Sequence, residues 1–399
     1  MDDNTYIIQS AEGDFIYAPL SRFLCKLSNF DTSIGIPPAI FKFADGGDYP
    51  KRWGHLVVIP TQICNLHCSY CYAHLAHSRQ IIDKEKLKIA YDFLLSQDQE
   101  PHKSVSFIGG GEPLVAWDLI EWSINYLEQH KKRKDTVSYA ITTNATLLNR
   151  QKIQFLRSHN VHIEVSFDIL KDIQERQRPF LHTDMSSYDS VINCLNVLDE
   201  TNSSYSIRAT VTSDTAKRMP EMIKSLTHYT NIKYVKLEPV TSQDTCDRYF
   251  YDEYTEYFWQ ARLIGSNESI NVTNSIIDSV EHIKDISCVG DFCVCADGNI
   301  SACHRSSSPL DTEYDLCRIG DVSDTITISE EKLFAFMSYS DNTERCVNCF
   351  ARWHCAGFCP VELRGLSTEA MQIKCEFIKE NIRRRLLEIY KHQAESEKP

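Results

Sequence analysis

The chain has 399 residues, of which 42% are hydrophobic, and it carries 55 Asp and Glu against 42 Lys and Arg. This length is typical of two or three domains, and the apolar fraction is sufficient for a buried core. The net charge of −13 argues against a nucleic-acid-binding protein, which usually presents a basic face. The sequence has no apolar run of membrane-spanning length, and its acidic start does not resemble a secretion signal. We therefore expect a soluble, cytoplasmic protein that binds neither nucleic acid nor membrane.

Residues 1–54 form the first predicted segment. Strand-like runs at 6–10 and 15–18 flank a turn and predict a hairpin. Residues 21–27 are predicted to form a short helix, and the glycine-rich stretch 46–50 then breaks the chain.

Strand-like and helical patterns alternate over residues 55–270. Strands are predicted at 55–60, 104–108, 137–143, 162–167, 204–212 and 234–240. Helices are predicted at 83–96, 117–130, 150–159, 188–200, 220–229 and 247–263, with Asp83 as the N-cap of the first. Near-continuous apolar strands in such βα units predict a parallel sheet covered by helices. The pattern alone leaves open a full barrel, a partial barrel or an open sheet.

The alternation stops after about residue 270, and cysteines become dense. A cysteine-rich domain is predicted over 271–380, with a final amphipathic helix at 376–392, so that 381–399 hold the end of this helix and a polar tail. The chain has sixteen cysteines, a number that in a reducing compartment indicates metal binding or redox chemistry.

Cys64, Cys68 and Cys71 form a Cys-x3-Cys-x2-Cys group directly after the first strand of the alternating region. Three thiolates from one loop can bind three irons of a [4Fe–4S] cluster and leave the fourth iron open to a small molecule. The alternative is a zinc site that is completed by a histidine of the same loop, namely His67, His74 or His77.

This cysteine group and the strand ends that follow it resemble the radical S-adenosylmethionine (SAM) superfamily. Tyr70 takes the aromatic place of the family's cysteine motif, and 109–113 (Gly-Gly-Gly-Glu-Pro) is similar to its GGEP motif. Residues 143–145 (Thr-Asn-Ala) are similar to TNG, but alanine replaces the glycine. Residues 166–168 (Ser-Phe-Asp) are similar to SxD, but Ile169 stands where glycine is usual.

The resemblance implies an α/β fold with a partial (β/α)6 TIM-like barrel over 55–270, whose strands end at the active site. The residues that it implies as SAM contacts are Tyr70, Gly110, Gly111, Glu112, Asn144, Ser166, Asp168 and Arg208. Glycine suits such a site because a chain without Cβ lets the backbone approach a ligand closely.

The second cysteine series matches the SPASM extension of the same superfamily. The resemblance implies two auxiliary [4Fe–4S] clusters, an outer one held by Cys346, Cys349, Cys355 and Cys375 and an inner one held by Cys288, Cys303 and Cys359. The fourth ligand of the inner cluster is left open among His282, Cys293, Cys295 and an unliganded iron. A pair of zinc knuckles is the alternative to the two clusters. The remaining cysteines are expected to be buried small apolar residues: Cys25, Cys194, Cys246 and Cys317.

By resemblance, the first of three [4Fe–4S] clusters would reduce bound SAM and release a 5′-deoxyadenosyl radical that removes a hydrogen atom from the substrate. The auxiliary clusters would accept an electron, which makes the net reaction a two-electron oxidation. An electron donor such as flavodoxin or ferredoxin is implied. A base must also accept a proton, and Glu238 and His304 are candidates for this role.

Because SPASM enzymes mostly modify peptides, three functions are open. The first is a maturase that installs a carbon–carbon, ether or thioether crosslink in a ribosomally made precursor peptide. The second is an anaerobic sulfatase maturase that forms formylglycine, and the third is a non-catalytic iron–sulfur electron carrier. Sulfatase maturases have an Asp after the cysteine that matches Cys303; because His304 stands here, we favour the peptide maturase. Residues 1–54 are too short for a complete leader-binding winged helix, so they either pair with a leader peptide at a strand edge or cover the end of the barrel.

Overall fold

A small antiparallel sheet opens the chain in the computed structural model, which describes residues 4–41, 53–75, 77–241, 247–339 and 343–396. The predicted hairpin is confirmed, with β1 at Tyr6–Ile8 and β2 at Phe15–Ala18. The helix predicted at 21–27 is wrong, because β3 (Phe23–Lys26) pairs with every residue of the neighbouring strand β2 and these cross-strand backbone bonds override the local helical pattern. The predicted break at 46–50 lies outside the described residues.

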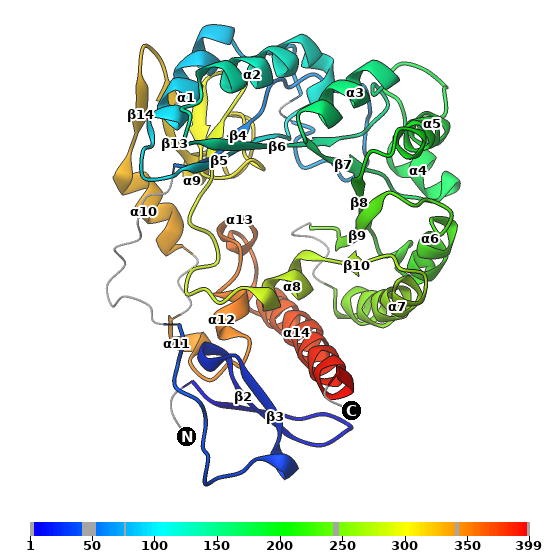
Figure 1. Ribbon diagram of the computed structural model, residues 1–399, viewed down its shortest axis with the longest axis vertical. Helices are drawn as coiled ribbons and strands as arrows, with labels where there is room; N and C mark the ends of the chain where they lie inside the picture. The colour runs from blue at the N-terminus through cyan, green and yellow to red at the C-terminus, as the bar shows by residue number, and fades with distance from the viewer. Residues whose placement is uncertain (1–3, 42–52, 76, 242–246, 340–342, 397–399) are drawn as a thin grey trace.

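The β1–β3 sheet packs against the C-terminal part of the chain. Its inward side chains Ile8, Phe15 and Tyr17 share an apolar cluster with Ile382 and Leu386 of α14 (Thr368–Ser396). In Figure 1 this small sheet lies below the rest of the molecule, beside α12 and α14. The sheet therefore covers the C-terminal helix.

The central sheet has eleven strands in the order β10-β9-β8-β7-β6-β5-β4-β11-β12-β13-β14. All six predicted strands are confirmed and pair in parallel: β4 (His55–Val58), β5 (His102–Phe107), β6 (Thr136–Thr143), β7 (His162–Ser166), β8 (Tyr205–Val211) and β9 (Ile232–Pro239). Figure 1 shows these strands following a curve, with helices on its outer side.

The predicted helices of this region are also confirmed, as α1 (Lys84–Ser96), α2 (Trp117–His130), α3 (Arg150–Ser158), α5 (Ser187–Glu200), α6 (Met219–Ser225) and α7 (Arg248–Asn267). Asp83 caps α1 as expected, since its side chain accepts a hydrogen bond from the backbone N–H of Glu85. The short α4 (Lys171–Gln177) was not predicted; most of its residues are polar, and its length is below two turns.

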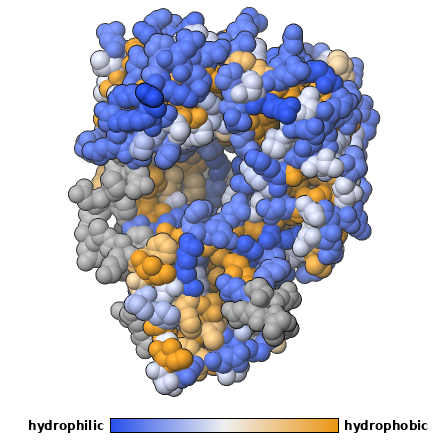
Figure 2. Space-filling model, in the orientation of Figure 1, coloured by the Kyte–Doolittle hydropathy of each residue, from blue (hydrophilic) through white to orange (hydrophobic). Residues whose placement is uncertain are grey.

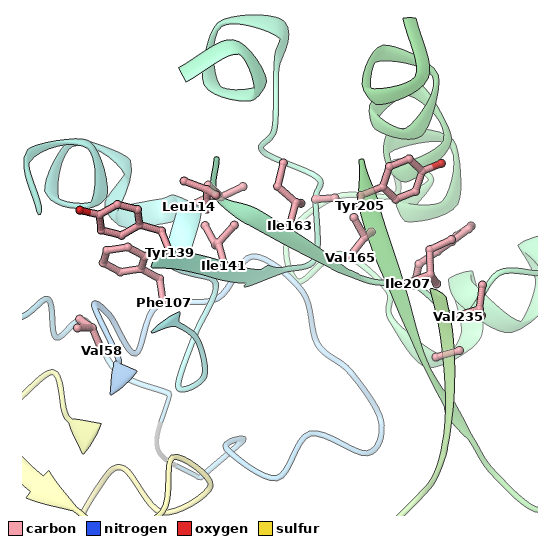
Figure 3. Close-up of a cluster of buried hydrophobic side chains, with 14 of the residues drawn as sticks. Val58, Phe107, Leu114, Tyr139, Ile141, Ile163, Val165, Tyr205, Ile207 and Val235 are labelled. Carbon is pink, nitrogen blue, oxygen red and sulfur yellow. The ribbon is translucent and has the colours of Figure 1, made fainter. Parts of the chain in front are cut away.

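Alternate strand residues point to opposite sides of the sheet. Figure 3 shows Val58, Phe107, Ile141, Val165 and Ile207, one from each of β4 to β8, in the large buried cluster that also includes inward-facing residues of the helices. The intervening residues of the strands face the concave side, where the functional residues lie.

The cysteine-rich region continues the central sheet. Strand β11 (Phe292–Val294) pairs in parallel with β4, and β12 (Asn299–Ser301), β13 (Arg318–Val322) and β14 (Ile326–Ile328) extend the sheet in antiparallel fashion. The rest is short and mostly helical, and the predicted final helix begins earlier than expected, at Thr368. The shorter elements of the chain are β10 (Val272–Thr273), α8 (Ser275–Asp278), α9 (Tyr314–Cys317), α10 (Glu330–Ser338), α11 (Thr343–Cys346), α12 (Arg352–Cys355) and α13 (Pro360–Leu363). Within the described residues, the helices are all too short or too polar to span a membrane.

Candidate functional site

A cavity of about 480 Å³ lies at the carboxyl ends of the parallel strands. Its walls come from the loop after β4, the ends of β5 to β9, and residues 304–305, 354–362 and 374–378 of the C-terminal region. Figure 2 shows the molecule hollowed between the central sheet and the C-terminal region. The volume is in the range of small-molecule sites, and the carboxyl end of a parallel sheet is where such sites form.

Most of the residues singled out in the sequence meet in this cavity. Those that line it are Cys64, Cys68, Tyr70, Cys71, Gly110, Gly111, Glu112, Asn144, Ser166, Arg208, Glu238, His304, Cys355 and Cys359. Those that do not are Asp168, Cys288, Cys303, Cys346, Cys349 and Cys375. The sheet therefore gathers strand-end residues, the first cysteine loop and part of the second series at one place.

The glycines after β5 pack against the first cysteine loop (residues 59–82). A Cβ on Gly111 would lie 2.0 Å from the carbonyl oxygen of Ile63, and one on Gly110 would lie 2.6 Å from a methyl of Ile59. The backbone N–H of Gly111 donates to Thr61 O at 2.9 Å. Ligand approach was the reason expected for these glycines; the structure adds close packing against the loop that carries Cys64, Cys68 and Cys71.

Glu112 and Asn144 join neighbouring strand ends to this loop. The buried Glu112 carboxylate accepts hydrogen bonds from Thr143 Oγ1 at 2.6 Å, from the Asn144 N–H at 2.7 Å and from the Leu114 N–H at 3.0 Å. The Asn144 side-chain amide donates to Asn65 Oδ1, in the first cysteine loop, at 2.9 Å. Burial raises the pKa of Glu112, and these donors oppose that rise. Both side chains thus fix the shape of the site as well as line it.

The two positions where the sequence departs from the family's glycines have positive φ. Ala145 has φ +62° and Ile169 has φ +68°, in the left-handed region that glycine favours. The backbone at both strand ends therefore keeps the conformation typical of glycine although the side chains have changed.

Asp168 lies beneath the cavity wall and is fully buried. Its carboxylate accepts hydrogen bonds from Tyr70 Oη at 2.5 Å, Gln177 Nε2 at 2.9 Å, Arg178 Nε at 3.1 Å and the Thr210 N–H at 3.0 Å. These donors occupy both oxygens, so Asp168 contributes to the site by holding Tyr70 and Arg178. Arg178 itself lines the cavity and was not singled out, because nothing in its sequence spacing marks it.

The three thiols of the first loop are close neighbours. Burial raises the pKa of Cys64 to about 12, and the nearby Cys68 and Cys71 thiols add to this rise. Three thiolates on one loop suit a [4Fe–4S] cluster, in which each thiolate binds a different iron. A zinc site completed by a histidine of the loop stays the alternative.

The second cysteine series falls into two spatial groups. Burial raises the pKa of Cys288 to about 12, with smaller contributions from Cys303 and Cys359. Burial likewise raises the pKa of Cys375, with contributions from Cys346 and Cys349. Cys355 belongs with this second group, since the pKa of its thiol is raised mainly by burial and also by the neighbouring Cys375 and Cys346 thiols. The inner and outer cluster sets implied by the resemblance stay predictions, which these neighbourhoods support.

Candidates for the open position of the inner set lie in different places. Cys293 and Cys295 are fully buried against Val57 and Ile59 of the sheet, and the Cys293 thiol lies within hydrogen-bonding reach of Cys295. The carbonyl oxygen of His282 lies 3.1 Å from His354 Nδ1. The fourth ligand therefore stays a prediction with these alternatives.

The four cysteines outside the motifs are not all alike. Cys194 and Cys317 are buried, as expected, whereas Cys25 is only half-buried, and Cys246 lies outside the described residues. The Cys317 thiol is within hydrogen-bonding reach of Cys303, a neighbour that no spacing rule indicated.

Both candidate bases line the cavity. His304 Nδ1 lies 3.1 Å from Asp291 Oδ2. Glu238 Oε1 accepts hydrogen bonds from the Ser275 N–H at 3.0 Å and from Ser275 Oγ at 2.6 Å. His304 thus has a carboxylate that can orient its ring.

The cavity is rich in cations. Arg178, Arg208, Lys284, Arg305 and Lys374 all line it. Arg208 is only weakly engaged by a carboxylate, at 3.9 Å from Glu164, and its side chain is 43% exposed. Such a wall suits a ligand with a carboxylate.

Comparison with known proteins agrees with this site. Residues 58–226 match the radical SAM superfamily. A cysteine-type anaerobic sulfatase-maturating enzyme of Clostridium novyi (strain NT) is 26% identical over 179 residues, which are 44% of this chain and 48% of that enzyme. The chain spans about half the length of the curated relatives it matches first.

Solved structures share the fold. The structure of anSMEcpe with bound AdoMet superimposes with a TM-score of 0.70 at 19% identity and covers 85% of this chain and 99% of that one. Streptococcus suis SuiB bound to the precursor peptide SuiA gives a TM-score of 0.52 at 13% identity, over 90% of this chain and 95% of that one. Residues 58–226 of the chain thus form a radical SAM domain.

Proposed function

We propose that this protein is a radical SAM maturase of the SPASM type that oxidises a peptide side chain and installs a crosslink. The observation that carries the proposal is the shared cavity, which the first cysteine loop lines together with Cys355 and Cys359 of the second series. A substrate held there would lie between the SAM-cleaving centre and the auxiliary centres.

Cys64, Cys68 and Cys71 would hold the SAM-binding cluster. The Gly110 and Gly111 backbone and Arg208 would hold SAM, and Ser166 and Tyr70 would complete its surroundings. When bound, the cluster would supply an electron and SAM would supply a strongly oxidising radical. Glu112, Asn144 and Asp168 would keep the loop and the strand ends in register through the hydrogen bonds described above.

Two further [4Fe–4S] clusters would be held by the two thiol groups of the second series, which brings the total to three. Cys355 and Cys359 line the cavity, so each of the two groups has one member at the substrate space. His304, oriented by Asp291, and Glu238 are the groups that could take up the proton that the substrate loses. An electron donor such as flavodoxin or ferredoxin would supply the first electron.

The peptide substrate is supported by structures of the same fold. These include anSMEcpe with bound AdoMet and a Kp18Cys peptide, and SuiB bound to its precursor peptide. A relative at 23% identity is the radical SAM cyclopropyl synthase TigE of Paramaledivibacter caminithermalis. A cavity of about 480 Å³ argues against an electron carrier, which needs no such space.

An anaerobic sulfatase maturase is the second candidate. It is supported by the similarity to the Clostridium novyi enzyme and by the fold shared with anSMEcpe. His304 in place of the aspartate expected in that group favours the crosslinking maturase.

The sequence led us to expect that the N-terminal segment covers the end of the barrel; we propose instead that the β1–β3 sheet covers the C-terminal helix, on which it packs. The alternative is pairing of a leader peptide with an edge of this sheet. Deleting residues 1–50 and titrating the leader separates the two: unchanged affinity supports the covering role.

The test of the proposed function is co-expression with short open reading frames beside the gene, followed by mass spectrometry of their products. A crosslinking maturase should remove two hydrogen atoms from one peptide and join two of its side chains, as tandem spectra would show. A product with formylglycine in place of Cys or Ser would identify the sulfatase-maturase activity instead. A C68A variant is the control, in which every peptide should stay unmodified.

A further inference from the structure

We infer that Arg178 is a positioning residue whose fixed positive charge raises the reduction potential of the cluster at Cys64, Cys68 and Cys71. The inference rests on the cluster-binding part of the proposed function and is independent of the peptide. It concerns a residue that belongs to none of the motifs in the sequence.

Arg178 is held rigidly beside the first cysteine loop. It directly follows α4, and its backbone N–H donates to Gln174 O at 2.7 Å. Its guanidinium lies over the Tyr70 ring, 5.2 Å from the centroid, and donates to Asp168 at 3.1 Å. The Arg178 side chain is only 9% exposed and that of Asp168 is fully buried.

The adjoining backbone ties the same loop to the end of α4. The N–H of Ser69 donates to Gln177 O at 2.9 Å, and the N–H of His67 donates to Pro179 O at 2.8 Å. The loop on both sides of Cys68 is thus joined to the residues that flank Arg178, so the guanidinium and the thiol have a fixed relation.

Arg178 and the three thiols of the first loop line the same cavity, whereas Asp168 does not line it. The guanidinium covers the ring of Tyr70, which lies between Cys68 and Cys71 in the loop. In the Arg178–Asp168 pair, it is therefore the cation that faces the thiols.

A guanidinium stays charged at every accessible pH, so its effect on a cluster is permanent. One-electron reduction makes the cluster more negative, and a cation close by in a low-dielectric site stabilises that state. The Asp168 carboxylate forms an ion pair with the buried Arg178 guanidinium, because a buried charge needs a partner of opposite sign. The two residues should therefore act on the reduction potential with opposite signs.

The experiment is a redox titration followed by electron paramagnetic resonance on the full chain, reconstituted anaerobically with iron and sulfide. The first cluster is identified as the one whose signal changes when SAM is added. R178Q should lower the reduction potential of this cluster by about 59 mV or more, which corresponds to a tenfold change in the one-electron equilibrium constant. D168N should raise it, while R178K should stay near the wild-type value because the charge is kept.

R176Q is the matched control, since Arg176 lies on α4 two residues before Arg178 but pairs with Asp214 at the surface, where its side chain is 54% exposed. It should leave the potential of the first cluster unchanged. If R178Q loses the cluster altogether, R178K and D168N still decide the matter.

An R178Q protein with full iron content and wild-type potential would overturn the inference. Shifts of the same sign in R178Q and D168N would also overturn it, because they would indicate a general disturbance of the loop. Failure of the wild-type chain to assemble a cluster at Cys64, Cys68 and Cys71 would instead refute the proposed function.

Discussion

The two cysteine regions of the molecule are built in opposite ways. The first places Cys64, Cys68 and Cys71 on one loop. A backbone bridge at Thr61–Ile81 closes this loop, and a bridge at Leu66–Phe180 attaches it to the chain that follows α4. The second spreads seven cysteines over residues 288–375, where α11, α12 and α13 have only four residues each. The first site is a loop attached to a sheet whose strands are already paired and packed, whereas the second consists of segments too short to be stable alone.

This difference indicates what each region needs from its metal. Clusters bound to the first loop would add chemistry to a region that is already packed. Clusters bound by the second series would also join segments far apart in the sequence, so their binding energy is in part folding energy.

Removing the iron should therefore separate the two regions, and this is the largest effect that we expect. In hydrogen–deuterium exchange, residues 343–375 of the cluster-free protein should exchange roughly tenfold faster or more, while β4 to β9 stay protected. Equal changes in both regions would contradict the comparison.

Single cysteine substitutions should reproduce the contrast. C68A should lose SAM cleavage but keep its thermal unfolding temperature, whereas C349A should lose resistance to proteolysis around 343–375. Both variants are assayed for iron, for SAM cleavage and by limited digestion. A C68A protein that unfolds more readily than C349A would reverse the expected order.

Gly111→Ala tests whether packing of the first loop depends on the glycines. The added methyl would lie 2.0 Å from Ile63 O, and relieving this contact should cost about 1–3 kcal/mol of stability and displace the loop. Gly54→Ala is the control, because its Cβ would meet only the Glu100 side chain, at 3.1 Å or more. Urea denaturation and iron content check both; a stable G111A protein with full iron content would refute the packing role.

The left-handed residues of the same region offer a paired test. Ala145→Gly should stabilise the protein by up to about 1 kcal/mol, since glycine adopts φ +62° without strain. Ile169→Gly relieves similar strain but removes a side chain that is 1% exposed, so a loss of about 3 kcal/mol or more should dominate. Thermal unfolding of the two variants should therefore move in opposite directions.

The smallest effect concerns the ion pair that joins α7 to α14, the helix that carries Cys375. Glu388 accepts hydrogen bonds from Arg262 at 2.8 Å and from Arg385 at 2.6 Å. Burial raises the pKa of Glu388, but the arginines outweigh it and hold the pKa below its ordinary value. A lowered carboxylate pKa stabilises the fold at neutral pH, and this contribution is lost as the pH falls through the folded pKa.

Glu388→Gln should accordingly reduce stability at pH 7 by roughly 0.5–1 kcal/mol and have less effect near pH 4. Urea denaturation at the two pH values measures the difference. A loss that is equal at both would show that the charge is unimportant.

The sequence was most informative where the chemistry is local. The Cys64–Cys71 spacing, the glycines after β5 and the six βα units are set by neighbours in the chain, so pattern alone identified them. The sequence pattern could not show that hydrogen-bond donors surround the Asp168 carboxylate, because Arg178 and Thr210 approach this carboxylate only in the folded chain. For the same reason it missed β3, whose strand conformation depends on pairing with β2, and the contact between Cys303 and Cys317.

The central claim is that the first cysteine loop supports reductive cleavage of SAM. The most direct test incubates the anaerobically reconstituted protein with SAM and a strong reductant and measures 5′-deoxyadenosine. The wild-type chain should produce it and C68A should not. Absence of 5′-deoxyadenosine from an iron-loaded wild-type protein with every reductant tried would contradict the account.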